Sequence, residues 1–493
     1  MSKLLKNSKF RIALLTIAVL LAIACYLIYK SGSTTLIDKE AYMGFRTMIE
    51  ETGGPEGEGI NSQRQLMDMI EKWADDNGIE YKEDKSGNII FNKPAVKRKK
   101  NVSPTLVAVS MNYETAYDNA RILASAAAIA QSDLESGRRI VVFANDEQGL
   151  SEGYKRLNKK YLTSKTKAIY LDKGSSTYLS TGSFQQRCSS LTVPAAREEN
   201  SFDTAVTIRI SGLKSGIIGP GISKQPDPFS ALSTLLTRLK SKSVECRLAE
   251  VSIGSNGNMY PVSLEVTVVL NSYNLSSFTG YIDKRIKAWE KAYGENLEDL
   301  VYEYEVDDSE DALPETVYTA EATDKLTGVL YTIKSGAYKY SASDAIPEGK
   351  EEGDIYGINC LTAIETDDDS ITIKMITQGY DDTYTDRITT DNKAASELYE
   401  CKYKITGTVP AFSNDRDSLS RTFINTYKEV NKSAAVDPEL AQETDNFFTP
   451  CSYLAGINEK ADIIHIRTKS SEAARIANTI LCYLKAKGNT TIF

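Results

Sequence analysis

Between residues 105 and 171 the hydrophobic positions form short continuous runs separated by helical patterns. Runs at 105–110 (TLVAVS), 139–144 (RIVVFA) and 167–171 (KAIYL) have the unbroken apolar character of strands that are covered on both faces. The Ala-rich segment 118–131 predicts a helix, and 152–160 predicts a second, shorter one. This strand–helix–strand–helix–strand order is typical of a largely parallel sheet with helices on its faces.

The pattern changes in the middle of the chain and returns near its end. Residues 188–409 mix alternating strands with amphipathic helices, which is typical of an α+β unit. After Pro410 the α/β pattern resumes with two further helices and a strand. We therefore expect residues 35–187 and 410–493 to form one α/β domain, with 188–409 inserted into it.

Residues 12–29 form an apolar segment without any charged side chain. As a helix with a rise of about 1.5 Å per residue it would be about 27 Å long, close to the ~30 Å hydrocarbon core of a bilayer. Lys3, Lys6, Lys9 and Arg11 precede it and only Lys30 follows closely, so the positive-inside rule predicts a cytoplasmic tail at 1–11. We expect a single-pass signal-anchor in the cell membrane with the bulk of the chain outside the cell. A cleaved and secreted form is the alternative, because residues 22–24 (AIA) resemble a cleavage site.

The composition limits both the size of the folded units and the partners. With 493 residues the chain is longer than one hydrophobic core normally organises, so we expect at least two units. Its 58 basic and 67 acidic residues give a net charge of -9, which disfavours nucleic acid as a partner. The chain has a single histidine, His465. Because histidine is the commonest zinc ligand, any zinc chemistry would be short of ligands.

Acidic residues follow each of the three predicted strands. Asp118 comes after the first, Asp146 and Glu147 directly follow the second, and Asp172 follows the third. Because the carboxyl ends of neighbouring strands form the ligand crevice of open α/β sheets, we expect these side chains to converge. Carboxylates at strand ends also cap helices and lie in solvated turns, so a purely structural role stays open.

Several segments occur in the order seen in a known family over most of residues 40–485. They are GNIIFNKPA at 87–95, PTLVAVSMN at 104–112, DNARILASAAAIA from Asp118, FANDEQG at 143–149, YLD at 170–172 and ISGLKSGIIG at 210–219. Together they resemble the di-zinc aminoacylase and carboxypeptidase-like exopeptidases, in particular the bacterial aminoacyl-histidine dipeptidases (peptidase D). The resemblance implies a zinc-exopeptidase-like α/β fold with a mostly parallel sheet, helices on both faces and an inserted α+β lid domain. In several relatives the lid forms a homodimer.

The same resemblance implies two zinc ions held by two histidines and three carboxylates, with one glutamate as general base. Three family positions keep a carboxylate in this chain. Asp118 matches the bridging aspartate, Asp172 matches the fourth ligand, and Glu147 takes the place of the general base.

The other positions that the resemblance identifies are substituted. Gln148 stands where the family has a ligand carboxylate, and the final ligand histidine aligns with about Asn446. The family's His-x-Asp falls on residues 110–112 (SMN) or one residue later, and neither alignment holds a histidine; Ile217 replaces a lid histidine. His465 lies among isoleucines in a predicted strand, so we expect a hydrogen-bonded core histidine there. Because neutral side chains offset little of the cost of taking Zn²⁺ out of water, we expect the zinc affinity to collapse.

These substitutions favour a pseudopeptidase: the dipeptidase fold retained outside the cell as a binding or scaffold module, without a cofactor and with Glu147 as a vestigial general base. The alternative is a cell-surface metallo-dipeptidase that holds one hard cation on Asp118, Asp172 and Glu147. A third hypothesis is a structural protein that dimerises through its lid. Three carboxylates without a cation would also favour a basic peptide or an amine as ligand.

Overall fold

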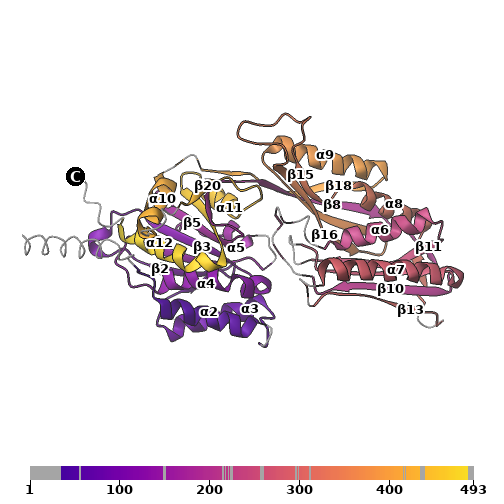
Figure 1. Cartoon of the computed structure of the whole chain (residues 1–493), viewed down its shortest axis with the longest axis horizontal. Coiled ribbons are helices and arrows are strands. Elements are labelled where there is room, and N and C mark those ends of the chain that lie inside the picture. Colours follow the sequence, from indigo (N-terminus) through magenta and orange to yellow (C-terminus); the bar gives the residue numbers. More distant parts are fainter. Residues whose placement is uncertain are drawn as a thin grey trace, which may run out of the picture.

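The computed structural model describes residues 35–54, 57–147, 151–213, 216, 218–219, 221, 226–255, 260–294, 297, 299–309, 313–414, 416, 418–432 and 439–486. The expected membrane span at 12–29, Gln148 and Ile217 lie outside the described residues. Within them, no helix combines the length and the apolar character that crossing a bilayer requires. The described chain forms two lobes, each built around one large sheet (Figure 1).

The sheet of the first lobe has eight strands in the order β1-β2-β4-β3-β5-β21-β6-β20. The four central strands, β4, β3, β5 and β21, are parallel to one another. On either side of them, β2 pairs antiparallel with β4 and β6 pairs antiparallel with β21. The predicted mostly parallel α/β sheet is therefore present. The strands are β1 (Lys82–Glu83), β2 (Ile89–Lys93), β3 (Thr105–Met111), β4 (Arg139–Asn145), β5 (Lys167–Lys173), β6 (Tyr178–Ser180), β20 (Ala441–Glu443) and β21 (Asp462–Thr468).

Helices cover both faces of this sheet because its strands are apolar on both sides. In β3, Val107 and Val109 belong to one core, while Leu106 and Ala108 belong to the core on the opposite face. The first core is covered by α2 (Lys39–Gly53), α3 (Gln63–Asp76), α4 (Ala116–Gln131), α10 (Ser418–Val430) and α12 (Ala473–Ala486). The second is covered by the short helices α5 (Glu152–Lys155) and α11 (Cys451–Ile457).

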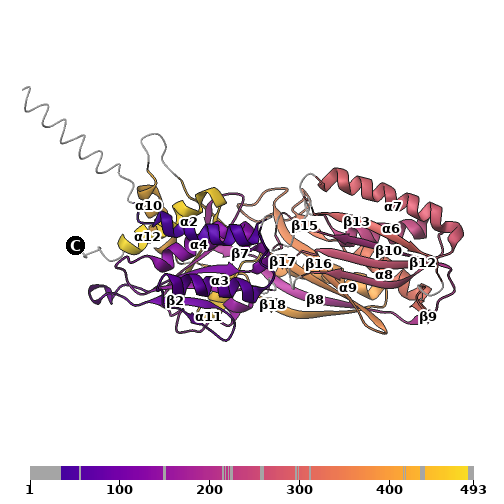
Figure 2. The same cartoon turned by 90° about the horizontal axis from the view of Figure 1, so that it is seen from below.

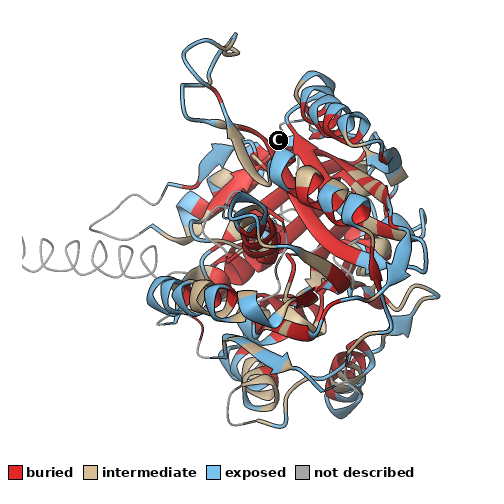
Figure 3. Ribbon diagram, turned by 90° about the vertical axis from the view of Figure 1, so that its right-hand side faces the viewer, coloured by how far each residue is buried: buried red, intermediate tan, exposed pale blue. Residues whose placement is uncertain are grey.

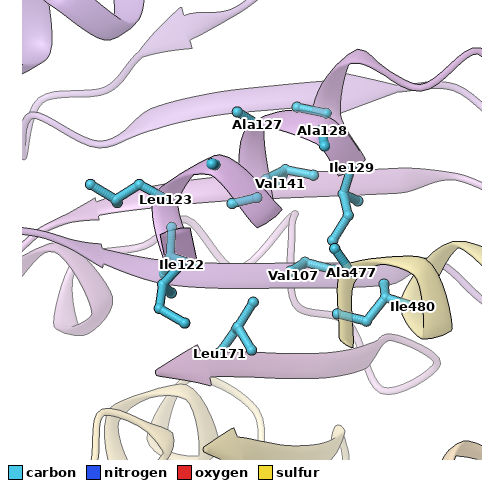
Figure 4. Close-up of a cluster of buried hydrophobic side chains, with 14 of the residues drawn as sticks. Val107, Ile122, Leu123, Ala127, Ala128, Ile129, Val141, Leu171, Ala477 and Ile480 are labelled. Carbon is cyan, nitrogen blue, oxygen red and sulfur yellow. The ribbon is translucent and has the colours of Figure 1, made fainter. Parts of the chain in front are cut away.

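Helix α4 lies at the centre of the first core. Its alanines are small, so the helix packs closely against the strands β3 and β4 and against the helices α2 and α12. Figure 4 shows Ile122 and Ile129 of α4 with Val107 of β3 and Ile480 of α12 in this core. Because α12 comes from the C-terminus, the two ends of the described chain share one core.

The second lobe contains a nine-stranded sheet in the order β13-β10-β12-β11-β16-β17-β8-β18, with β15 paired to β16. All its pairings are antiparallel. Four helices pack into one hydrophobic core with it, and in Figure 3 their exposed sides face away from the buried strands. The helices are α6 (Pro228–Ser241), α7 (Ser272–Tyr293), α8 (Ala320–Thr332) and α9 (Asp382–Leu398). The strands are β8 (Gln185–Pro194), β10 (Thr204–Ser211), β11 (Cys246–Gly254), β12 (Ser263–Leu270), β13 (Val301–Asp307), β15 (Gly336–Lys339), β16 (Ile355–Thr366), β17 (Ser370–Gly379) and β18 (Lys402–Val409).

The chain passes between the lobes twice, and the two crossings lie side by side (Figures 1 and 2). The outgoing crossing runs from β7 (Gly182–Ser183) into β8, and the returning one runs from β18 into β19 (Phe412–Ser413). β8 pairs with β18 and β7 pairs with β19, both antiparallel. A further small pair joins β9 (Arg197–Glu199) to β14 (Thr316–Tyr318).

Two sequence expectations differ from the structure in their bounds. The helix expected at 152–160 is the single turn α5, because the chain turns again from Arg156 and buries Leu157 against the sheet. β8 begins at Gln185, so this strand crosses the expected boundary between 187 and 188.

Candidate functional site

The carboxyl ends of β4, β3 and β5 lie next to one another because these strands are parallel neighbours. A cavity of about 20 Å³ opens there, lined by Ser110, Asn112, Asp146 and Asp172 together with residues of α4. This volume is close to the space that one water molecule needs. We call these four residues and their surroundings the relict site, because they include positions that the family resemblance assigns to metal binding.

Asp146 is the most buried carboxyl of the relict site, with 4% of its surface exposed. Its Oδ1 accepts a hydrogen bond from the backbone N of Ser151 at 2.7 Å. Burial, with a small contribution from the charge of Asp172, raises the pKa of Asp146 to about 6, although hydrogen bonds from Ser151 and Ser110 act in the opposite direction. From the sequence, Asp146 was expected at the end of the second predicted strand, but no metal-binding or catalytic role was predicted for it.

Asp172 lies in the cavity, but Asp118 and Glu147 are not among the residues that line it. Asp118 occupies the first turn of α4, where its side chain is 63% exposed and its Oδ1 lies 3.5 Å from Nζ of Lys173. Glu147 sits in the exposed turn after β4. Of the three carboxylates that follow the neighbouring strands, Asp172 alone lines this cavity.

Arg467 of β21 places a second cation beside the relict site. β21 pairs with β5 in parallel, and the register puts Arg467 opposite Asp172. Burial alone would lower the pKa of the Arg467 guanidinium, but Asp172, Tyr178 and Asp445 raise it overall. A protein cation thus lies near Asp172, and another lies 3.5 Å from Asp118.

Ser110 and Asn112, which stand at the histidine and aspartate positions of the family's His-x-Asp, both have structural partners. Ser110 Oγ lies 3.1 Å from the hydroxyl of Tyr154 and 3.4 Å from that of Tyr170. The side-chain amide of Asn112 donates to the backbone oxygen of Asp146 at 2.7 Å. These hydrogen bonds connect the carboxyl end of β3 to α5, to β5 and to the turn after β4.

The region around Asn446 is organised by its neighbour Asp445. Asn446 itself is half-buried in the segment between β20 and α11. Asp445 Oδ2 lies 2.7 Å from Nδ1 of His465, and Asp445 Oδ1 accepts from the hydroxyl of Tyr178 at 2.7 Å. Burial would raise the pKa of Asp445, but His465 and Tyr178 hold it below its usual range. His465 is fully buried and its ring stacks on Tyr170, so the interpretation as a hydrogen-bonded core histidine is confirmed.

The residues present do not fit the di-zinc centre that the family resemblance implies. Among the residues that the structure describes, no group of three or more His, Cys, Asp or Glu is placed to hold a metal ion. Zinc needs such a set of charged or imidazole donors to replace its hydration shell. Here the neighbouring donors are a serine and an amide, and Lys173 and Arg467 place positive charge near Asp118 and Asp172.

No family model matches the chain, and no curated protein matches it. Among solved structures, the chain is similar to aminoacylhistidine dipeptidase from Vibrio alginolyticus, with a TM-score of 0.52 and 16% identity over 91% of this chain and 97% of that one. It also matches aminopeptidase PepT from Bacillus cereus and a tripeptidase from Staphylococcus aureus, each with a TM-score of 0.45 and 10% identity over 92% of this chain. The resemblance to the dipeptidase is therefore confirmed at the level of the fold.

Proposed function

We propose that this protein is a membrane-anchored pseudopeptidase, which keeps the dipeptidase fold as a binding or scaffold module outside the cell and performs no zinc catalysis. The observation that carries the proposal is the presence of a protein cation near each of the two relict ligand carboxylates, Asp118 and Asp172. Lys173 lies beside Asp118, and Arg467 lies opposite Asp172. A metal ion entering here would have to displace or outcompete both cations.

The energetic cost of metal binding supports the same conclusion. A divalent cation gives up its hydration shell on binding, and only charged or strongly donating ligands offset that loss. Ser110 and Asn112 are neutral and already hydrogen-bonded. Glu147 would have no metal-bound water to activate and would serve as a surface residue.

Metal content and hydrolysis test the catalytic part of the proposal. The full-length chain is incubated with zinc, desalted and examined by element analysis, and it is then assayed on an aminoacyl-histidine dipeptide. The dipeptidase from Vibrio alginolyticus serves as a positive control. We expect far less than one zinc per chain and no turnover. Turnover that disappears in Glu147→Gln would contradict the proposal and establish the metallo-dipeptidase alternative.

The anchored, extracellular part of the proposal rests on the charge pattern of residues 1–30. Its test is fractionation of cells that carry the chain with a C-terminal tag. We expect the protein to stay in the membrane pellet after alkaline carbonate treatment, and the tag to be removed by protease added to intact cells. A variant that lacks residues 12–29 should leave the pellet. Release of the intact chain by carbonate, or a protected tag, would contradict this part alone.

A further inference from the structure

A second and much larger cavity lies where the lobes meet, on the face of the eight-stranded sheet opposite α4. Its volume is about 580 Å³, within the range of roughly 300–1,000 Å³ that is usual for small-molecule sites. One wall comes from the first lobe, from α5 with the turn after it and from α11; these elements lie on the side of that lobe that faces the second (Figure 1). The other wall comes from the end of β18 and from β8. We call this cavity the interlobe cleft.

The first wall of the interlobe cleft is basic. Lys155, Arg156 and Lys159 line it together with one carboxylate, Glu152. Glu152 lies 3.2 Å from Nζ of Lys155 and 3.0 Å from Nε of Arg156, so it orients both side chains but neutralises only one charge. The wall keeps an excess of positive charge in a chain whose net charge is -9, and it should attract an anionic group.

The rest of the cleft combines apolar surface with hydrogen-bonding groups. Tyr453 and Ile457 of α11 supply an apolar floor, and Thr406 lies opposite on β18. β18 is the last strand of its sheet and pairs with β8 on one side. Its ladder shifts register between Ile405 and Gly407, so Thr406 is the extra residue of a bulge, a feature that often re-aims a side chain beside a binding site.

We propose that the interlobe cleft binds a short acidic peptide. A carboxylate is held by Lys155 and Lys159, an apolar side chain packs on Tyr453 and Ile457, and the peptide amides bond to the hydroxyl and backbone groups near Thr406. Because the two walls belong to different lobes, the occupant also holds the lobes in one relative position. This site involves none of the positions assigned to metal binding, so it goes beyond the proposed pseudopeptidase function and stands without it.

Binding is tested by titration calorimetry of the full-length chain with N-acetyl-Leu-Glu, which carries two carboxylates. The matched probe is the neutral N-acetyl-Leu-Gln amide. We expect saturable binding of the acidic peptide, at least about tenfold tighter than that of the amide, and weaker binding as the salt concentration rises. Equal binding of both probes, or no saturable binding of the acidic one, would overturn the proposal.

Two kinds of variant locate the site. Gly407→Leu is designed to fill the cleft, because Gly407 lines it, does not have a positive φ, and a Cβ there meets only Cys188 Cβ at 4.0 Å. Its control is Gly280→Leu in α7, where a Cβ meets nothing within 4 Å.

The second variant is the double charge reversal Lys155→Glu with Lys159→Glu, and its control is Lys85→Glu in an exposed turn. Both test variants should weaken binding of N-acetyl-Leu-Glu at least about tenfold, and both controls should leave it unchanged. The charge reversal affects only exposed side chains, so it should not disturb folding. It therefore tests the location of the binding site even if Gly407→Leu does not fold. Unchanged affinity in the charge-reversed chain would place the peptide elsewhere and refute the assignment.

Discussion

Asp146 should make the stability of the first lobe fall as the pH rises from about 4 to about 6. Its pKa in the folded chain is raised to about 6 because the carboxyl is buried, whereas an unfolded Asp titrates near 3.8. Between these values the folded state keeps a proton that the unfolded state has released, so folding is favoured below this window and penalised above it. A difference of about two pKa units corresponds to about 3 kcal/mol, which is the penalty expected at neutral and alkaline pH.

The substitution Asp146→Asn removes this penalty while preserving the geometry. The amide oxygen of asparagine can still accept the hydrogen bond from the backbone N of Ser151, which is 2.7 Å long in the structure. Since asparagine carries no charge, the variant has no burial cost of ionisation. At pH 8 we expect it to be more stable than the unmodified chain by up to about 3 kcal/mol, and at pH 4 we expect the difference to vanish.

Urea unfolding followed by tryptophan fluorescence measures this effect in the first lobe alone. The chain has two tryptophans: Trp73 in the core of the first lobe and Trp289 on α7 of the second. A Trp289→Phe background leaves Trp73 as the only reporter. Asp118→Asn is the control, because its side chain is exposed. If Asp146→Asn is less stable at pH 8, or keeps the full pH dependence of the unmodified chain, the raised pKa is not the cause.

Two further substitutions probe the packing around the relict site. Asp445→Ala removes the buried partner of His465. It should lower the free energy of unfolding by about 3–5 kcal/mol in the same assay, because His465 and Tyr178 lose a fully buried acceptor. A loss below about 1 kcal/mol would mean that the pair of Asp445 and His465 does not hold this segment in place. Gly153→Ala should lower the free energy of unfolding by about 1–3 kcal/mol, because a Cβ there would come within 3.0 Å of Asn88 Oδ1. Its control, Gly44→Ala on the exposed side of α2, should raise the free energy of unfolding by about 0.5–1 kcal/mol. Equal effects of the two glycine substitutions would refute the close approach at Gly153.

The sequence alone was sufficient to predict β3, β4, β5 and the helix between the first two of them. These segments are predictable because their apolar residues follow a continuous or helical pattern that depends on neighbours along the chain. The dipeptidase-like fold could also be predicted from the sequence, because the short segments that resemble the family lie within or next to these elements. β8 (QQRCSSLTVP) was missed because its alternation includes many polar residues, and only pairing with β17 and β18 makes it a strand.

The chemistry of the relict site was decided by tertiary structure. Arg467 is far from Asp172 in sequence, and only the parallel pairing of β21 with β5 brings them together. Asp146 and Glu147 are adjacent and chemically alike, yet the turn after β4 buries the first and exposes the second, and burial is what raises the pKa of Asp146. The interlobe cleft likewise requires α5, α11 and β18 to meet. The pattern of the sequence shows the periodicity of one segment at a time. Charge pairing, burial and cavities depend instead on which distant segments become neighbours, and the packing of the whole chain determines those neighbours.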